Sequence, residues 1–103
     1  MGIAIQIVKE DLGTVISYRG GIDINDDYYQ MRNVAREMNL VLISTIDDSG
    51  DTIINQPQLE IFKKEILQLR ARADVNQAVV DVLQQAADAI TPYSCEYLKF
   101  IGD

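Results

Sequence analysis

The chain has 103 residues, of which 48% are apolar and 24% are charged, a composition typical of a folded domain and not of a disordered segment. It has a formal net charge of -7, no histidine, no tryptophan and one cysteine. These counts exclude Ser-His and Cys-His catalytic pairs and an intramolecular disulfide, and the negative charge argues against direct binding of nucleic acid. We therefore expect a single domain over residues 1–103 that is not an enzyme and that acts by binding.

The first part of the chain predicts a hairpin followed by a helix. Isoleucines alternate with other residues at Ile3, Ile5 and Ile7, which indicates a strand with one buried face, and residues 14–19 predict its hairpin partner. A turn is expected at residues 10–13, and two consecutive glycines at positions 20 and 21 are expected to end the second strand. Apolar residues then recur at helical spacing over residues 26–38, where the preceding asparagine is the expected N-cap.

The rest of the chain predicts further strands and two more helices. Residues 40–46 are rich in β-branched residues, and residues 52–55 are expected to pair with them as a second hairpin. Pro57 suits the first turn of a helix, and residues 74–90 predict the next helix, with a capping box from Asp74 to Gln77. The last expected strand covers residues 96–101.

This order of elements predicts an α+β fold. We expect one small sheet of about five strands, made of two hairpins and a C-terminal strand and packed by three helices.

Three aspartates, Asp74, Asp81 and Asp88, follow one another at intervals of seven residues and share one face of a predicted helix. No lysine or arginine occurs between Arg72 and Lys99, so pairs one turn apart along that helix cannot neutralise the face. An acidic face without positive partners indicates a basic binding partner. We call these three residues the aspartate stripe and take it as a second candidate surface.

The acidic surplus is larger in the first half of the chain, since residues 1–56 have a net charge of -5 and residues 57–103 have -2. Tyrosine beside aspartate is effective at an interface, because the ring supplies buried area at low entropic cost while the carboxylate steers a cationic partner. The candidate partner-binding residues are Asp23, Asp26, Asp27, Tyr28, Tyr29, Asp47, Asp48 and Asp51. Two alternatives remain open. The aspartates could instead form local hydrogen bonds in turns or lie on solvated faces, and the two tyrosines could pack on the sheet.

No cofactor and no metal is expected. Asp47, Ser49 and Asp51 have the spacing that opens an EF-hand loop, but Thr52 stands where that loop needs glycine and Gln58 where it needs glutamate. No apolar stretch reaches the length of a membrane span, and a lone cysteine has no need of an oxidising compartment. We therefore expect a cytoplasmic protein that binds neither membrane nor nucleic acid.

The chain ends in Glu96-Tyr97-Leu98-Lys99-Phe100-Ile101-Gly102-Asp103. This ending resembles the tails of small acidic immunity proteins encoded beside bacterial polymorphic toxins, including those of contact-dependent growth inhibition systems, and the size and acidity are similar too. The resemblance implies a cytoplasmic protein that masks the active site of a cognate toxin, and acidic members of this class often meet basic nucleases. No individual binding residue is implied.

Two other functions stay open. The chain could be a small non-enzymatic scaffold or a homo-oligomeric subunit, in which the helices of residues 57–90 pair with a second copy. An enzyme is the third hypothesis, and a screen for phosphate or sugar turnover tests it. Replacing Asp47, Asp48 and Asp51 by lysine should abolish toxin neutralisation while leaving a hydrophobic self-interface intact.

Overall fold

In the computed structural model, which describes residues 2–9 and 13–102, four strands form one antiparallel sheet in the order β2-β1-β4-β3. The strands are β1 (Gly2–Lys9), β2 (Thr14–Asp23), β3 (Asp51–Ile54) and β4 (Glu96–Ile101). The helices are α1 (Asp26–Glu37), α2 (Gln56–Arg70) and α3 (Gln77–Ala89), with a 3-10 turn, η1, at Ile43–Thr45. Within the described ranges, the predicted α+β class, with one sheet and three helices, is confirmed, and so is the first hairpin.

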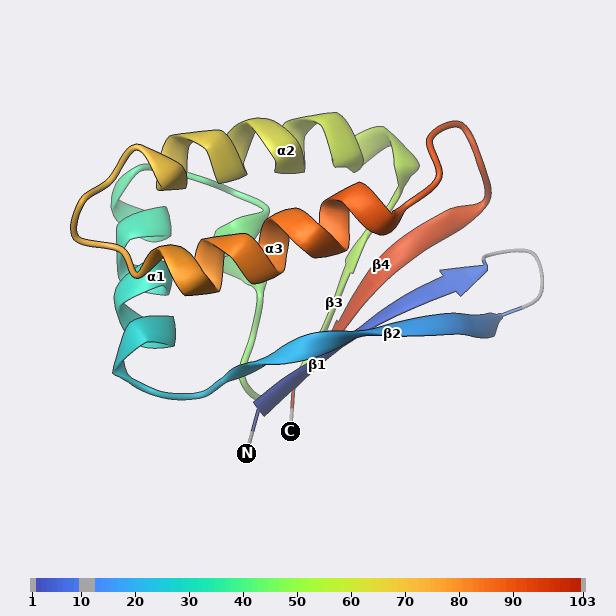
Figure 1. Ribbon diagram of the computed structural model, residues 1–103, viewed down its shortest axis with the longest axis horizontal. Helices are drawn as coiled ribbons and strands as arrows, with labels where there is room; N and C mark the ends of the chain where they lie inside the picture. Colours follow the sequence, from blue (N-terminus) through green and yellow to red (C-terminus); the bar gives the residue numbers. More distant parts are fainter. Residues whose placement is uncertain (1, 10–12, 103) are drawn as a thin grey trace.

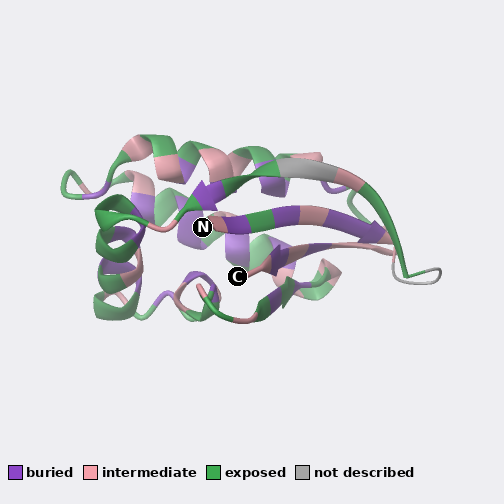
Figure 2. Cartoon of the chain, turned by 90° about the horizontal axis from the view of Figure 1, so that it is seen from below, coloured by how far each residue is buried: buried purple, intermediate pink, exposed green. Residues whose placement is uncertain are grey.

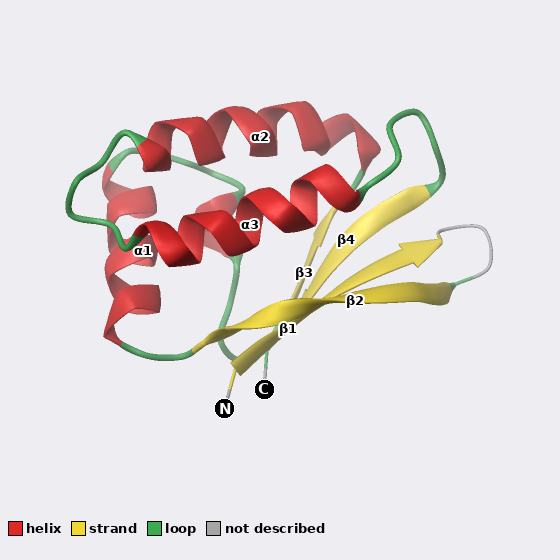
Figure 3. Ribbon diagram, viewed as in Figure 1, coloured by secondary structure: helices red, strands yellow, loops and turns green. Residues whose placement is uncertain are grey.

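The helices cover one face of the sheet (Figures 1 and 3). α2 and α3 run side by side over the strands, and α1 lies across the end of the molecule that β2 leads into. Ile3, Ile5 and Ile7 of β1 are buried beneath the helices, whereas Ala4 is exposed and Gln6 is half-buried on the opposite face. Figure 2 shows this alternation along β1, which is the pattern of an antiparallel sheet covered on one side.

The C-terminal strand β4 lies inside the sheet. It pairs with β1 on one side and with β3 on the other, and Ile101 is opposite both Ala4 and Asp51. The predicted second hairpin is therefore wrong: β3 forms close to the expected residues 52–55, but its partner is β4 and not residues 40–46.

Residues 40–46 do not form the predicted strand. Asn39 adopts a left-handed conformation with φ of 58°, and the Leu40 N–H donates to the Ala35 carbonyl at 2.8 Å, a hydrogen bond that closes the C-terminus of α1. After this turn, the buried residues recur at every third position and not at every second one. They are Leu40, Ile43 and Ile46.

A buried carboxylate replaces the missing strand partner of this segment. Glu65 of α2 is 5% exposed, and its two oxygens accept the N–H groups of Leu42 at 3.1 Å and Ile43 at 2.9 Å. Buried backbone groups require a partner, and these two find it on a helix instead of a neighbouring strand. The β-branched composition of residues 40–46 is therefore overridden by a contact distant in sequence.

Gly20 and Gly21 do not end β2, contrary to the prediction, because the strand continues to Asp23. The register against β1 shifts near these glycines, as at a β-bulge, and Gly20 has a φ of 77°. A Cβ at Gly21 would lie 2.8 Å from the carbonyl oxygen of Ile3, so glycine permits the close approach of the two strands. The turn predicted at residues 10–13 falls mainly on residues outside the described ranges.

Asparagines cap α1, α2 and α3. Asn25, Asn55 and Asn76 each accept a backbone N–H from the first turn of the helix that follows. Asn25 is the cap expected from the sequence. The capping box predicted at Asp74 is wrong, because the cap of α3 lies two residues later in the chain.

Replacing Glu65 by alanine is expected to lower the free energy of unfolding by about 2–4 kcal/mol, because two backbone N–H groups lose their acceptor. Glu65→Gln should fall between the alanine variant and the parent, since one side-chain oxygen remains. Urea unfolding followed by circular dichroism measures both changes. The matched control is Glu60→Ala on the exposed face of α2, which should stay within about 0.5 kcal/mol of the parent. A Glu65→Ala loss no larger than that of the control would contradict the role of this carboxylate.

Candidate functional site

The structure brings the two predicted groups of loop carboxylates to the same end of the sheet. Asp23 ends β2 opposite Gly2, and Asp51 begins β3 opposite Ile101. Both groups therefore lie where β1 begins and β4 stops, close to the two chain ends marked in Figure 1. We call this surface the acidic end. It consists of Asp23, Asp26, Asp27, Asp47, Asp48 and Asp51.

The two tyrosines beside the acidic end have different environments. Tyr28 is fully buried, and its hydroxyl donates to the carbonyl of Ile46 at 2.9 Å. The prediction that Tyr28 anchors a partner is therefore wrong, because its ring belongs to the core. Tyr29 is 38% exposed and donates its hydroxyl to a carboxylate oxygen of Asp48 at 3.0 Å, so it joins α1 to the loop before β3.

Arg32 was not among the predicted site residues, yet it organises this part of the surface. Its guanidinium lies 5.5 Å from the ring centroid of Tyr28 and 5.0 Å from that of Tyr29, both within cation-π range. The same group lies 3.8 Å from Asp48. The charge of Asp48 is thus partly neutralised inside the protein. The sequence contained the signal, because Arg32 follows the two tyrosines by four and three residues on a predicted helix.

The other carboxylates of the loop before β3 also have partners in the protein. Asp47 accepts the backbone N–H of Ser49 at 3.0 Å and its hydroxyl at 3.1 Å. These hydrogen bonds, the backbone one above all, hold the pKa of the Asp47 carboxyl below its usual range. Asp51 lies 3.7 Å from the ammonium group of Lys99 on the neighbouring strand. Asp48 and Asp51 therefore lie beside a cation, whereas the described hydrogen bonds to Asp47 come from uncharged groups of Ser49.

The carboxylates at the junction of β2 and α1 have fewer charged partners within the described part of the chain. Asp23 and Asp26 are exposed and form no ion pair among the residues whose side chains the structure describes. Asp27 accepts one hydrogen bond, at 2.9 Å, from the uncharged side chain of Asn76. At the acidic end, Asp23, Asp26 and Asp27 therefore form a group of carboxylates without an ion pair among the side chains that the structure describes.

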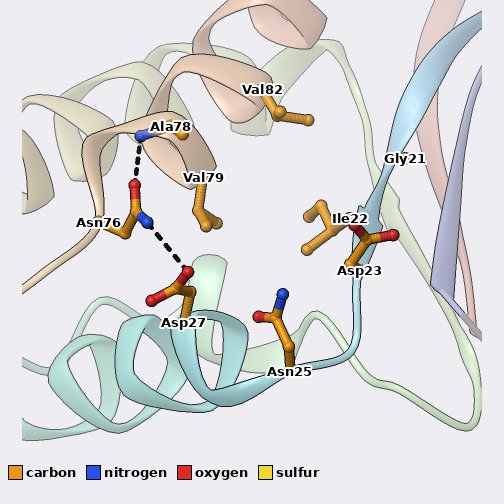
Figure 4. A pocket seen from close by; sticks show the side chains of 9 residues that line it. All are labelled: Gly21, Ile22, Asp23, Asn25, Asp27, Asn76, Ala78, Val79 and Val82. Carbon is orange, nitrogen blue, oxygen red and sulfur yellow. Dashed lines mark hydrogen bonds between the residues drawn. The ribbon is translucent and has the colours of Figure 1, made fainter.

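A groove of about 240 Å³ opens beside these carboxylates, between the end of β2, the start of α1 and the start of α3 (Figure 4). Ile22, Val79 and Val82 face one another across it. Asn76 fixes one side, since its amide oxygen accepts the N–H of Ala78 at 2.9 Å and its amide nitrogen donates to Asp27. The full lining is Gly21, Ile22, Asp23, Asn25, Asp27, Asn76, Ala78, Val79 and Val82.

The aspartate stripe is not without positive partners, which corrects the prediction made from the sequence. Arg70 at the end of α2 lies 2.8 Å from Asp81, and Arg72 in the following loop lies 2.8 Å from Asp74. The hydrogen bonds from Arg72 hold the pKa of Asp74 below its usual range. Asp88 accepts a hydrogen bond from Gln84 at 3.0 Å. The stripe is therefore a weaker candidate for recognising a basic protein than the acidic end.

Comparisons with known proteins identify no relative: no protein-family model, no curated protein and no solved structure matches the chain. Across residues 2–9 and 13–102, no helix combines the length and the apolar character needed to cross a membrane. The functional argument therefore depends on the side chains described above.

Replacing Asp48 by asparagine is expected to lower the pKa of Tyr29 towards its ordinary value of 10.0, because the hydrogen bond to the Asp48 carboxylate is the main cause that raises it. This bond favours the protonated phenol, so its contribution to stability is present at neutral pH and is lost as the pH rises through the raised pKa. NMR titration of the tyrosine Cζ signals measures the shift. Asp26→Asn is the control, and an unchanged Tyr29 pKa in Asp48→Asn would disprove the coupling.

Proposed function

We propose that this chain is a bacterial cytoplasmic immunity protein that binds and neutralises a cognate toxin, without catalysis, by covering the active site of a basic nuclease. The observation that carries the proposal is the group of open carboxylates Asp23, Asp26 and Asp27 at the junction of β2 and α1. They belong to a chain with a net charge of -7. The resemblance of the C-terminal residues to the tails of immunity proteins points to the same class.

The physical case depends on complementary charge. A nuclease active site must attract phosphate, so it is rich in lysine and arginine, and a surface of fixed carboxylates is complementary to it. Long-range attraction of this kind raises the association rate and orients the encounter. Asp23 lies at the end of a paired strand and Asp26 in the first turn of a helix, so both are held on regular structure. Fixed charges lose little conformational freedom on binding.

Affinity capture of the tagged protein from its own bacterium, at low and at high salt, tests this function directly. We expect mass spectrometry to find the basic C-terminal domain of a large secreted protein, retained less well at high salt. Co-expression should then suppress the toxicity of that domain. Recovery of this protein alone, or of an assembly indifferent to salt whose members are not toxic, would refute the proposal.

Neutralising the open carboxylates should weaken toxin binding more than neutralising the stripe. The test variant replaces Asp23, Asp26 and Asp27 by asparagine, and the matched control replaces Asp74, Asp81 and Asp88 in the same way. Both variants change the net charge equally, so a difference between them reports position and not total charge. We expect the test variant to lower the association rate about tenfold at low salt and the control to lower it less.

Surface plasmon resonance over a range of salt concentrations measures these rates. Equal losses in the two variants would show that only the overall charge matters. A larger loss in the control would assign recognition to the aspartate stripe instead.

A homo-oligomeric scaffold is the second candidate, and exposed apolar residues favour it. Ile61 and Leu67 of α2 are 53% and 64% exposed, and Val41 is 66% exposed in the segment after α1. Such side chains are what a self-interface through the helices would bury. Sedimentation velocity across a range of protein concentrations distinguishes the two functions: a monomer throughout would reject the scaffold, whereas a stable dimer that Ile61→Lys dissociates would favour it.

A further inference from the structure

The groove between β2, α1 and α3 has an apolar wall and an acidic mouth. Ile22 forms one side of the wall, and Val79 and Val82 of α3 face it from the other (Figure 4). Val79 and Val82 are only half-buried, so part of their apolar surface stays open in the free protein. A ligand that covered this surface would gain free energy in proportion to the apolar area removed from water.

The charge at the mouth comes from two different elements. Asp23 extends from the end of β2, and Asp27 belongs to the first turn of α1. Neither carboxylate forms an ion pair within the part of the chain whose side chains are described. A cation at the mouth would therefore contact two negative charges without displacing a cation of the described part of the chain, and the one described hydrogen bond to Asp27 comes from the uncharged side chain of Asn76. This differs from the stripe, where Arg70 and Arg72 already occupy two of the three carboxylates.

Two asparagines keep the shape of the groove. The side-chain oxygen of Asn25 caps α1 by accepting the Tyr28 N–H at 3.1 Å, which leaves its amide nitrogen facing the groove in Figure 4. Asn76 caps α3 and also donates to Asp27, so the two helix starts are joined across the opening. The groove is thus built from capped helix ends and a paired strand, and it does not need to form on binding.

We propose that this groove receives an arginine side chain of the partner protein, with the aliphatic stem against Val79 and Val82 and the guanidinium between Asp23 and Asp27. The volume of about 240 Å³ is below the roughly 300–1,000 Å³ typical of small-molecule pockets. Guanidinium fits this setting better than ammonium, because it is planar, weakly hydrated and able to reach two carboxylates at once. The Asn25 amide nitrogen is placed to donate to a carbonyl of the bound segment.

This inference rests on the proposed function for the identity of the partner, but its test does not use the toxin. The probe is N-acetyl-arginine amide, titrated into the full chain labelled with nitrogen-15. N-acetyl-citrulline amide is the control, because it has nearly the same shape and no charge. We expect the arginine probe to shift the amide signals of Ala78, Val79 and Val82 and the side-chain amide of Asn25, with a dissociation constant on the order of millimolar that rises with salt.

Two variants locate the binding. Ala78 is exposed at the groove, so Ala78→Trp should block it and abolish the probe-dependent shifts, whereas Gln85→Trp, exposed on the same helix but outside the groove, should keep them. Asp23→Asn should weaken probe binding about threefold to tenfold through the lost charge-assisted contact. If Ala78→Trp does not fold, Ala78→Arg serves in its place, since its own guanidinium would compete at the mouth.

Equal shifts with the arginine and citrulline probes would overturn the inference, as would shifts confined to residues outside the groove or no shift at all. Persistence of the shifts in the blocked variant would overturn it too. Experiments with the toxin test the proposed function separately. If the arginine probe binds in the groove but affinity capture yields no toxin, the arginine site is supported and the immunity function is refuted. If a toxin is neutralised equally well by the parent and by Ala78→Trp, the immunity function is supported and the role of the groove in toxin binding is refuted.

Discussion

The position of β4 between β1 and β3 is the constraint on which the rest of the structure depends. Leu98 and Phe100 of this strand are fully buried, and its two neighbours come from the start and the middle of the chain. The N–H of Gly102 donates to the Gly50 carbonyl at 2.9 Å, which ties the loop before β3 to the end of the sheet. A Cβ at Gly102 would lie 2.6 Å from the Asp47 carbonyl oxygen, so the sharp approach requires glycine. The acidic end exists because this pairing brings distant loops together.

Sequence periodicity predicted the elements whose signals are local, and it failed where distant residues decide. The alternation at Ile3, Ile5 and Ile7 and the cap at Asn25 needed only neighbouring residues, and both are present in the structure. Residues 40–46 have the composition of a strand, but the N–H groups of Leu42 and Ile43 are satisfied by Glu65, more than twenty residues away. The N–H groups of residues 44–46 bond to carbonyls within the segment itself. No local pattern contains the contact with Glu65, so strand propensity gave the wrong answer.

In the candidate site, too, local sequence patterns were predictable and contacts between distant residues were not. The crowding of aspartates in loops was visible in the sequence, but the partners of individual carboxylates were not, because Arg32 meets Asp48 and Arg70 meets Asp81 only through tertiary packing. The burial of Tyr28 was a different case. It precedes Met31 and Ala35, which continue the apolar face of α1 at helical spacing, so the sequence already placed it on the core side.

Pairing within the protein decides which negative charges can serve recognition. A carboxylate that already has a cation must give up that contact, or share it, before it gains another, so Asp81 and Asp48 offer less to a partner than their charge implies. Asp23 and Asp27 have no cation partner among the side chains that the structure describes, and they lie beside the half-buried side chains of Val79 and Val82 in the groove. Binding energy concentrates where a desolvated apolar contact and a charge-assisted hydrogen bond coincide. In this chain the apolar wall of the groove and the carboxylates at its mouth lie together, so a basic partner of the kind proposed would gain most there.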